Sequence, residues 1–172
     1  MTAETAYRWS AFDTRFGRQA AAIDGEGRLA RYWLHAGRGR FPGVQDDAAL
    51  EPVRVQVAEY CEGRRIAFDL RLHIEDGSAF ERGVWDAMCA IPFGETVSYG
   101  AIAKSLGSGP ETARAVGVAC NRNPIPLIVP CHRVVGADGK LVGFGGGIDL
   151  KRKLLDFESV IAGRPRDLFA AL

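Results

Sequence analysis

Residues 98–123 read "SYGAIAKSLGSGPETARAVGVACNRN" and carry the strongest fold signal in the sequence. Ser98 is a candidate N-cap, and Gly107 is placed to end the short helix that follows it. Pro110 stands at the first position of a second helix, where its missing N–H does no harm. The two short helices and their Gly/Pro turn predict a helix-turn-helix, a shape found in DNA-binding proteins and also in proteins that bind no nucleic acid.

A boundary precedes this helix pair. The stretch "EDGSAF" at residues 75–80 divides the chain into an N-terminal domain at 1–76 and a C-terminal domain at 77–172. Ser78 followed three residues later by Glu81 is a capping box, which predicts that a helix starts at this point.

Residues 1–76 have the patterns of a small sheet with a helix. Two apolar runs in 19–34 flank an Asp-Gly-Glu-Gly turn and predict a β-hairpin. Apolar residues at helical spacing predict a helix over 49–63. Strict alternation in "RIAFDLRLHIE" predicts a half-buried strand over 65–75, with His73 on its polar face and therefore at the surface.

Three more elements are expected after the helix pair. The stretch "PIPLIVP" at 124–130 predicts a short apolar strand, and "VVGADGKLVG" at 134–143 predicts a turn or small hairpin. A helix is predicted over 148–163. Its apolar stripe consists of Leu150, Leu154, Phe157 and Ile161.

Composition excludes several classes of protein. Charged residues make up 25% and the formal net charge is +1, which is too small for a strongly polybasic nucleic-acid binder. The apolar runs are too short to span a bilayer, and the first residues do not resemble a signal peptide, so a cytoplasmic protein is expected. The four cysteines form no C-x-x-C pair and no zinc-site pattern with histidine, which predicts free thiols, no metal and no cofactor.

The stretch "VPCHRVV" at 129–135 carries the chemistry. Cys131 is a buried structural thiol, a nucleophile or a metal ligand, and the neighbouring His132 and Arg133 favour a reactive thiol by lowering its pKa. A histidine base also needs a group that orients it, and Glu158 borders the apolar face of the last helix. Asp149 and Asp156 are the other acids on that helix.

The glycine-rich stretch "GFGGG" at 143–147 lacks the Lys-Ser/Thr pair of a P-loop and the spacing of a dinucleotide fingerprint. It is either a mobile surface loop or a loop whose backbone comes close to a flat ligand.

Taken together, three stretches resemble the O6-alkylguanine-DNA alkyltransferases, a family of direct-reversal DNA repair proteins. They are "IPFGETVSYG" at 91–100, "RAVGVACNRNPIPLIVPCHRVVG" at 114–136 and "GFGGGIDLKRKLLDFE" at 143–158. The resemblance is close over 80–158 and looser over the first 75 residues. It implies an α+β fold, with a small N-terminal antiparallel sheet and helix followed by a helical domain that holds a winged-helix-like helix-turn-helix and an active-site loop.

The resemblance also implies roles for individual residues. Cys131 would accept the alkyl group, His132 would deprotonate it through a water molecule, and Glu158 would orient His132. Tyr99 would donate a proton or hydrogen bond to the guanine leaving group. Asn123 would tie the helix-turn-helix to the active-site turn.

Further residues are implied to contact DNA and the flipped base. Arg114 would enter the duplex and take the place of that base. The other implied DNA contacts are Tyr99, Ala113 and Arg122. The implied base pocket consists of Val134, Gly143, Phe144 and Gly145. Phe144 and Gly145 stand where many relatives carry a tyrosine and a hydroxyl residue.

The expected function is repair of double-stranded DNA that contains O6-alkylguanine. The alkyl group would be transferred irreversibly to Cys131 in a single turnover. The protein is expected to act as a monomer. Three alternatives are a lesion sensor without transfer activity, a transcriptional regulator with a metal-bound cysteine domain, and a Cys-His hydrolase. The presence of Cys131 argues against the sensor, the lack of a cysteine-rich segment before residue 61 against the regulator, and the adjacent dyad against the hydrolase.

Overall fold

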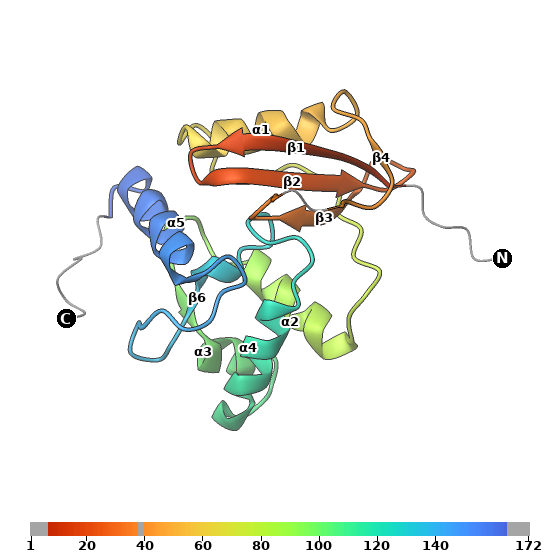
Figure 1. Cartoon of the computed structure of the whole chain (residues 1–172). Coiled ribbons are helices and arrows are strands. Elements are labelled where there is room, and N and C mark those ends of the chain that lie inside the picture. Colours follow the sequence, from red (N-terminus) through yellow and green to blue (C-terminus); the bar gives the residue numbers. More distant parts are fainter. Residues whose placement is uncertain (1–6, 38–39, 165–172) are drawn as a thin grey trace. The chain divides into compact units, whose positions relative to one another are not determined.

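The structure is a computed structural model that describes residues 7–37 and 40–164. The chain divides into two compact units, whose elements are labelled in Figure 1. The N-terminal unit consists of Met1–Asp76 with Pro124–Pro126, and the C-terminal unit of Gly77–Asn123 with Leu127–Leu172. Within the described residues, no helix has the length and apolar character that crossing a membrane requires.

The N-terminal unit is built on a four-stranded sheet with the order β3-β2-β1-β4. The strands are β1 (Arg8–Thr14), β2 (Gly17–Ile23), β3 (Leu29–Trp33) and β4 (Val44–Gln45). Strands β1, β2 and β3 are antiparallel neighbours, and β4 runs parallel to β1. Helix α1 (Glu51–Cys61) lies along β1 (Figure 1) and buries Val53, Val57 and Tyr60. The helix predicted over 49–63 is confirmed, whereas strand β1 was not predicted.

The predicted hairpin is confirmed as β2 and β3. Its turn is organised by Asp24, whose side chain accepts hydrogen bonds from the backbone N–H groups of Glu26 and Arg28, both at 2.9 Å. An aspartate that bonds its own turn backbone fixes the turn and leaves no buried N–H unpaired.

The strand predicted over 65–75 is wrong. This segment makes only an isolated bridge between Leu72 and Leu29. Elsewhere a side chain replaces a partner strand, because the Gln56 amide donates to the backbone O of Asp69 and accepts from its N–H, both at 2.8 Å. His73 is also not a plain surface residue, since its Nδ1 lies 2.6 Å from Asp24 Oδ2 and its side chain is 24% exposed.

The C-terminal unit begins with α2 (Ala79–Cys89), whose predicted capping box is present in full between Ser78 and Glu81. The predicted helix-turn-helix is formed by α3 (Tyr99–Ser105) and α4 (Ala113–Asn121), with the 3-10 turn Pro110–Thr112 between them. Ser98 caps α3 by accepting from the N–H of Ala101.

A second, two-stranded sheet joins distant parts of this unit. Strand β5 (Val97–Ser98) pairs in parallel with β6 (Val134–Val135). The predicted strand over 124–130 is wrong, because Leu127 has a φ of 75° and breaks the extended backbone there. The predicted turn after β6 is confirmed by the hydrogen bond from Gly136 N–H to Lys140 O at 2.9 Å.

The last helix, α5 (Ile148–Ile161), is confirmed, but its buried face differs from the predicted stripe. Ile161 is 41% exposed and Phe157 is half-buried. The buried side chains are Leu150, Lys151, Leu154, Leu155, Glu158 and Ser159. The helix is therefore rotated so that one lysine and one glutamate face the interior of the C-terminal unit.

Candidate active site

Cys131 stands at a sharp turn that the sequence sets up. Pro130 has φ −83° and ψ 68°, which are the angles of an inverse γ-turn, and Cys131 N–H donates to Val129 O at 2.9 Å. A single 3-10 turn, Cys131–Arg133, follows and leads into β6. The thiol is 6% exposed. We call residues 131–133 the Cys131 turn.

The β5–β6 pairing brings Tyr99 to the Cys131 turn. Ser98 pairs with Val135, so Tyr99 begins α3 where the chain leaves this short sheet. The Tyr99 hydroxyl donates to Val142 O at 2.9 Å, in the segment before the glycine-rich loop. Burial raises the pKa of Tyr99 to about 12, so its hydroxyl keeps its proton at neutral pH.

Glu158 joins His132 and a buried arginine. Its Oε1 lies 2.8 Å from His132 Nε2, and Arg133 donates to both carboxylate oxygens at 2.9 and 3.0 Å. Burial raises the pKa of Glu158, but the hydrogen bonds and charges of His132 and Arg133 outweigh it and hold the pKa well below its ordinary value. Glu158 is therefore an ionised, fully buried carboxylate that can only accept hydrogen bonds.

Gly94 explains part of the "IPFGETVSYG" stretch. Its φ is 79°, and a Cβ at this position would lie 2.6 Å from Ala162 Cβ, so only glycine fits without a shift of α5. The Gly94 N–H donates to Glu158 Oε2 at 3.2 Å. The close approach thus adds a backbone donor to the buried carboxylate.

The tautomer of His132 follows from this geometry. Because Glu158 can only accept, His132 Nε2 carries the proton of that hydrogen bond. Burial lowers the pKa of His132 despite the carboxylate beside it, which favours the neutral ring. Its Nδ1 is then an unprotonated acceptor, and it is buried without a hydrogen-bond partner among the described residues.

Cys131 is a protonated thiol in this structure. Burial raises its pKa, although a hydrogen bond with the Asn123 side chain and the charge of Lys151 act in the opposite direction. Asn123 Nδ2 also donates to Val129 O at 2.8 Å, just before the turn. A thiol in this state needs a base before it can act as a nucleophile.

The sequence interpretation missed Lys151. It is fully buried, and its Nζ donates to Val134 O at 2.6 Å, Val142 O at 3.2 Å and Tyr99 Oη at 3.3 Å. Its ammonium also lies 5.6 Å from the centre of the Tyr99 ring. Spacing offered a signal, since residues seven apart share a helix face and Lys151 stands seven before Glu158.

Arg133 has a different role from the expected one. The sequence suggested that its charge would lower the Cys131 pKa, but its guanidinium is occupied by Glu158 and by Ile91 O at 2.8 Å. The charge that acts to lower the pKa of Cys131 is that of Lys151.

The residues expected to contact DNA are spread over the helix-turn-helix. Tyr99 begins α3, whereas the others lie on α4 or directly after its last residue. Arg114 is exposed on the first turn, next to the half-exposed Ala113. Arg122, at the other end, is exposed and paired with Glu81 of α2 at 3.0 Å.

The expected pocket residues divide into a buried and an exposed group. Val134 is fully buried, with its carbonyl bound by Lys151. Gly143 and Gly145 are exposed, Phe144 is half-exposed, and a Cβ on Gly145 would meet no atom within 4 Å. Across the described residues, no group of three or more His, Cys, Asp or Glu side chains is arranged to hold a metal ion.

Comparison with known proteins identifies the family. The model of the 6-O-methylguanine DNA methyltransferase DNA-binding domain matches residues 79–160. The inducible methylated-DNA–protein-cysteine methyltransferase of Bacillus subtilis is 45% identical over 124 residues, which cover 70% of this chain and 68% of that protein. The Mycobacterium tuberculosis enzyme of the same name is 49% identical over 130 residues, or 76% of this chain and 71% of that one.

Comparison with solved structures points to the same family. The crystal structure of Mycobacterium tuberculosis OGT in complex with DNA matches with a TM-score of 0.82 and 40% identity, covering 95% of this chain and 97% of that one. The O6-methylguanine-DNA methyltransferase of Pyrococcus kodakaraensis matches with a TM-score of 0.62 and 26% identity, covering 88% and 98%. The chain belongs to the methylated-DNA–protein-cysteine methyltransferase family. The predicted α+β fold, DNA-repair function and enzyme class are confirmed.

Proposed function

We propose that Cys131 is the alkyl acceptor and that its substrate is O6-alkylguanine in double-stranded DNA. The carrying observation is a buried thiol on a tight turn, followed directly by a buried histidine whose Nε2 is hydrogen-bonded to a buried carboxylate. In the reaction, the sulfur attacks the alkyl carbon, an S–C bond forms, and the bond from that carbon to guanine O6 breaks. The thioether product has no leaving group that would regenerate the thiol, so each molecule reacts once.

His132 removes the thiol proton in this proposal. Its Nδ1 is the free ring nitrogen, and a water molecule between Nδ1 and the sulfur transfers the proton. Glu158 stabilises the imidazolium that results, as the carboxylate does in a Cys-His-acid relay. Asn123 fixes the turn through Val129 O.

Tyr99 assists the leaving group. The guanine departs as an anion that needs a proton or a strong hydrogen bond, and the Tyr99 hydroxyl is a protonated donor at the same site. Donation to guanine requires that this hydroxyl release Val142 O.

DNA is held by α4 in this proposal. The guanine must leave the base stack before its alkyl carbon can reach a buried thiol. Arg114 fills the gap in the duplex, while Ala113 and Tyr99 lie against the minor groove. Arg122 contacts a phosphate after release from Glu81. Val134, Gly143, Phe144 and Gly145 line the pocket for the flipped base.

We further propose that residues 77–172 form the DNA-binding and alkyl-acceptor domain and residues 1–76 a separate α+β domain. The Cys131 turn, with His132, and the helix-turn-helix all belong to the C-terminal unit, which supports action as a monomer. Four free thiols favour the reducing cytoplasm.

The test uses a duplex with one O6-methylguanine whose methyl group is radiolabelled. We expect transfer to stop at one methyl group per protein molecule, and no transfer with Cys131→Ala, which still binds the duplex. Multiple turnovers would contradict the single-use acceptor. Binding without transfer by the unaltered protein would instead identify a lesion-binding protein.

A further inference from the structure

The N-terminal unit contains a groove that the repair reaction does not use. It has a volume of about 650 Å³ and lies between the end of β1 and the second half of α1. Small-molecule sites have volumes of about 300–1,000 Å³, so this one is large enough for an organic ligand.

The groove has an apolar floor and a charged rim. Phe12 and Val57 are buried at its base beside Cys61. Burial raises the pKa of Cys61 to about 11, so this thiol is neutral at physiological pH and adds to the apolar surface. Such a floor suits an aromatic or aliphatic group.

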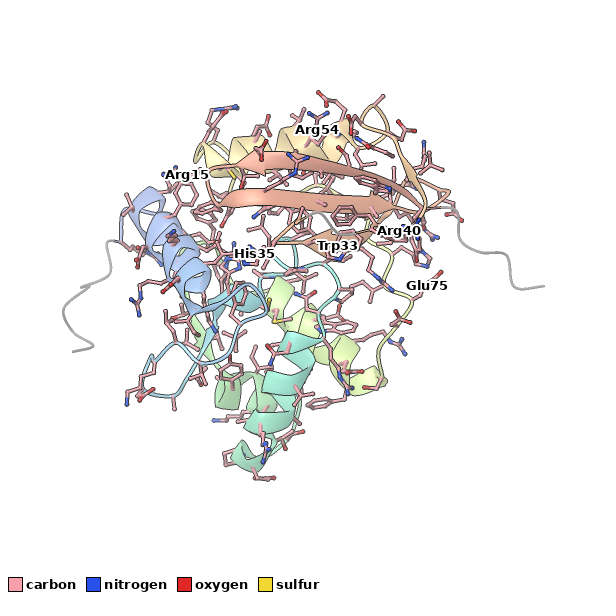
Figure 2. All side chains as sticks on the ribbon, in the orientation of Figure 1. Arg15, Trp33, His35, Arg40, Arg54 and Glu75 are labelled. Carbon is pink, nitrogen blue, oxygen red and sulfur yellow. The ribbon has the colours of Figure 1, made fainter. Side chains whose placement is uncertain are left out.

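Two arginines reach the groove from different elements. Figure 2 shows Arg15 at the end of the β1–β2 hairpin and Arg54 on α1. Arg15 is fixed by a hydrogen bond from its guanidinium to Cys61 O at 3.1 Å and by its position 5.6 Å from the Phe16 ring centre. One cation is therefore held in place before any ligand arrives.

The hydrogen-bond donors of Arg54 are less fully paired than those of Arg15. Its nearest carboxylate partner, Glu51, lies 3.4 Å away, and its Nε is buried without a hydrogen-bond partner among the described residues. A buried N–H without an acceptor is unfavourable. An anion that draws this guanidinium into the groove removes that cost.

The carboxylates at the rim of the groove do not neutralise the positive charge of the two arginines. Asp13 pairs with Arg18 at 3.4 Å, and Glu62 pairs with Arg64. Neither Arg18 nor Arg64 lines the groove. The carboxylates are thus engaged by cations outside it, and an anionic ligand finds arginine donors above an apolar floor.

We propose that this groove is a binding site for a small organic anion, with an apolar body on the floor and a carboxylate, sulfonate or phosphate group between Arg15 and Arg54. The site is separate from Cys131 and does not depend on the proposed function. It gives the N-terminal unit a ligand-binding role of its own.

The probe is 8-anilinonaphthalene-1-sulfonate, titrated into the full chain at neutral pH and followed by fluorescence. We expect saturable binding of the probe at one site. Arg54→Met and Arg15→Met should each weaken this binding roughly tenfold, because each removes one charge-assisted contact. Arg71→Met, which removes an exposed arginine outside the groove, should leave binding unchanged. Circular dichroism melts confirm that each variant is folded.

A neutral probe separates charge from apolar contact. N-phenyl-1-naphthylamine has the same rings without the sulfonate, and we expect it to bind at least about tenfold more weakly. Equal affinity for the two probes, non-saturable binding, or unchanged binding by folded Arg15→Met and Arg54→Met variants would overturn the proposal. Methyl transfer from the lesion duplex should be unaffected by both variants.

Discussion

The two units bury ionisable side chains very differently. Among the described residues of the N-terminal unit, Asp24 is the one buried charged side chain, and it lies at a hairpin turn. The C-terminal unit buries His132, Arg133, Lys151 and Glu158, all at or beside the Cys131 turn. Burying charge is costly unless it is paired, so the second arrangement is expected where the charges take part in chemistry.

The buried charges of the two units are paired by different kinds of partner. Asp24 ties a turn together, with Arg28 Nε at 2.7 Å and His73 Nδ1 at 2.6 Å. Glu158 connects a base, an arginine and a backbone N–H across three segments. The comparison predicts that changes at the first group affect stability alone, while changes at the second also affect alkyl transfer.

The largest effect is expected for His132→Gln. It removes the proposed base, and alkyl transfer should slow by roughly 100- to 10,000-fold. Because burial lowers the His132 pKa, the ring is neutral at pH 7, and the unaltered protein should lose rate only as pH falls through that lowered pKa. The pH dependence of the single-turnover rate measures this. An acid limb that persists in the variant would assign the base to another residue.

Glu158→Gln is expected to affect both stability and transfer. It leaves the buried Arg133 guanidinium without its counter-charge, which costs about 3–5 kcal/mol of unfolding free energy. Urea unfolding measures this loss, and the methyl-transfer assay measures the second effect. Asp156→Asn, on the same helix but half-exposed, is the matched control and should be nearly neutral. A loss below about 1 kcal/mol for Glu158→Gln would show that the buried pairing is unimportant.

Asp24→Asn should destabilise the N-terminal unit by about 1–2 kcal/mol without slowing transfer, because its partners Arg28 and His73 are partly exposed. Burial alone raises the Asp24 pKa, but hydrogen bonds from Arg28, His73 and the turn backbone lower it from 3.8 to about 2. The carboxylate therefore stabilises the fold above about pH 4, and this contribution is lost as pH falls towards 2.

Unfolding free energies measured at several pH values test the Asp24 prediction. The difference between the unaltered protein and Asp24→Asn should shrink over that acid range. A difference that does not change with pH would assign the effect to packing and not to charge.

The smallest effect is expected for Ser78→Ala. It removes one half of the capping box of α2, which should cost about 1 kcal/mol. Thermal melts of Ser78→Ala and of the control variant Ser108→Ala, which caps no helix, measure this loss. Methyl transfer by Ser78→Ala should be unchanged. A slowed transfer would mean that α2 acts on the site as well as on stability.

Local signals predicted much of the fold. The Asp24 turn, the Ser78 capping box and the Ser98 N-cap each depend on residues a few positions apart, and each is confirmed. The strand over 65–75 was wrong because alternation does not reveal that a side-chain amide, that of Gln56, replaces the neighbouring strand.

In the candidate active site, too, contacts between distant residues were harder to predict than local ones. Resemblance pointed to His132 and Glu158, and the structure places their side chains 2.8 Å apart. Lys151 was missed because lysine is ordinarily exposed, and its burial depends on carbonyls at residues 134 and 142 that converge only in the fold. The spacing from Glu158 indicates the helix face of Lys151, but the carbonyls that Lys151 binds come from distant segments and cannot be read from a single sequence.

In the proposed reaction, Cys131 alone accepts the alkyl group. A peptide mass map of all four cysteines, after reaction with a duplex that carries one O6-methylguanine, tests this. We expect one added methyl group on the Cys131 peptide and none on the peptides of Cys61, Cys89 and Cys120. A methyl group on Cys120, the other buried thiol of the C-terminal unit, would contradict it.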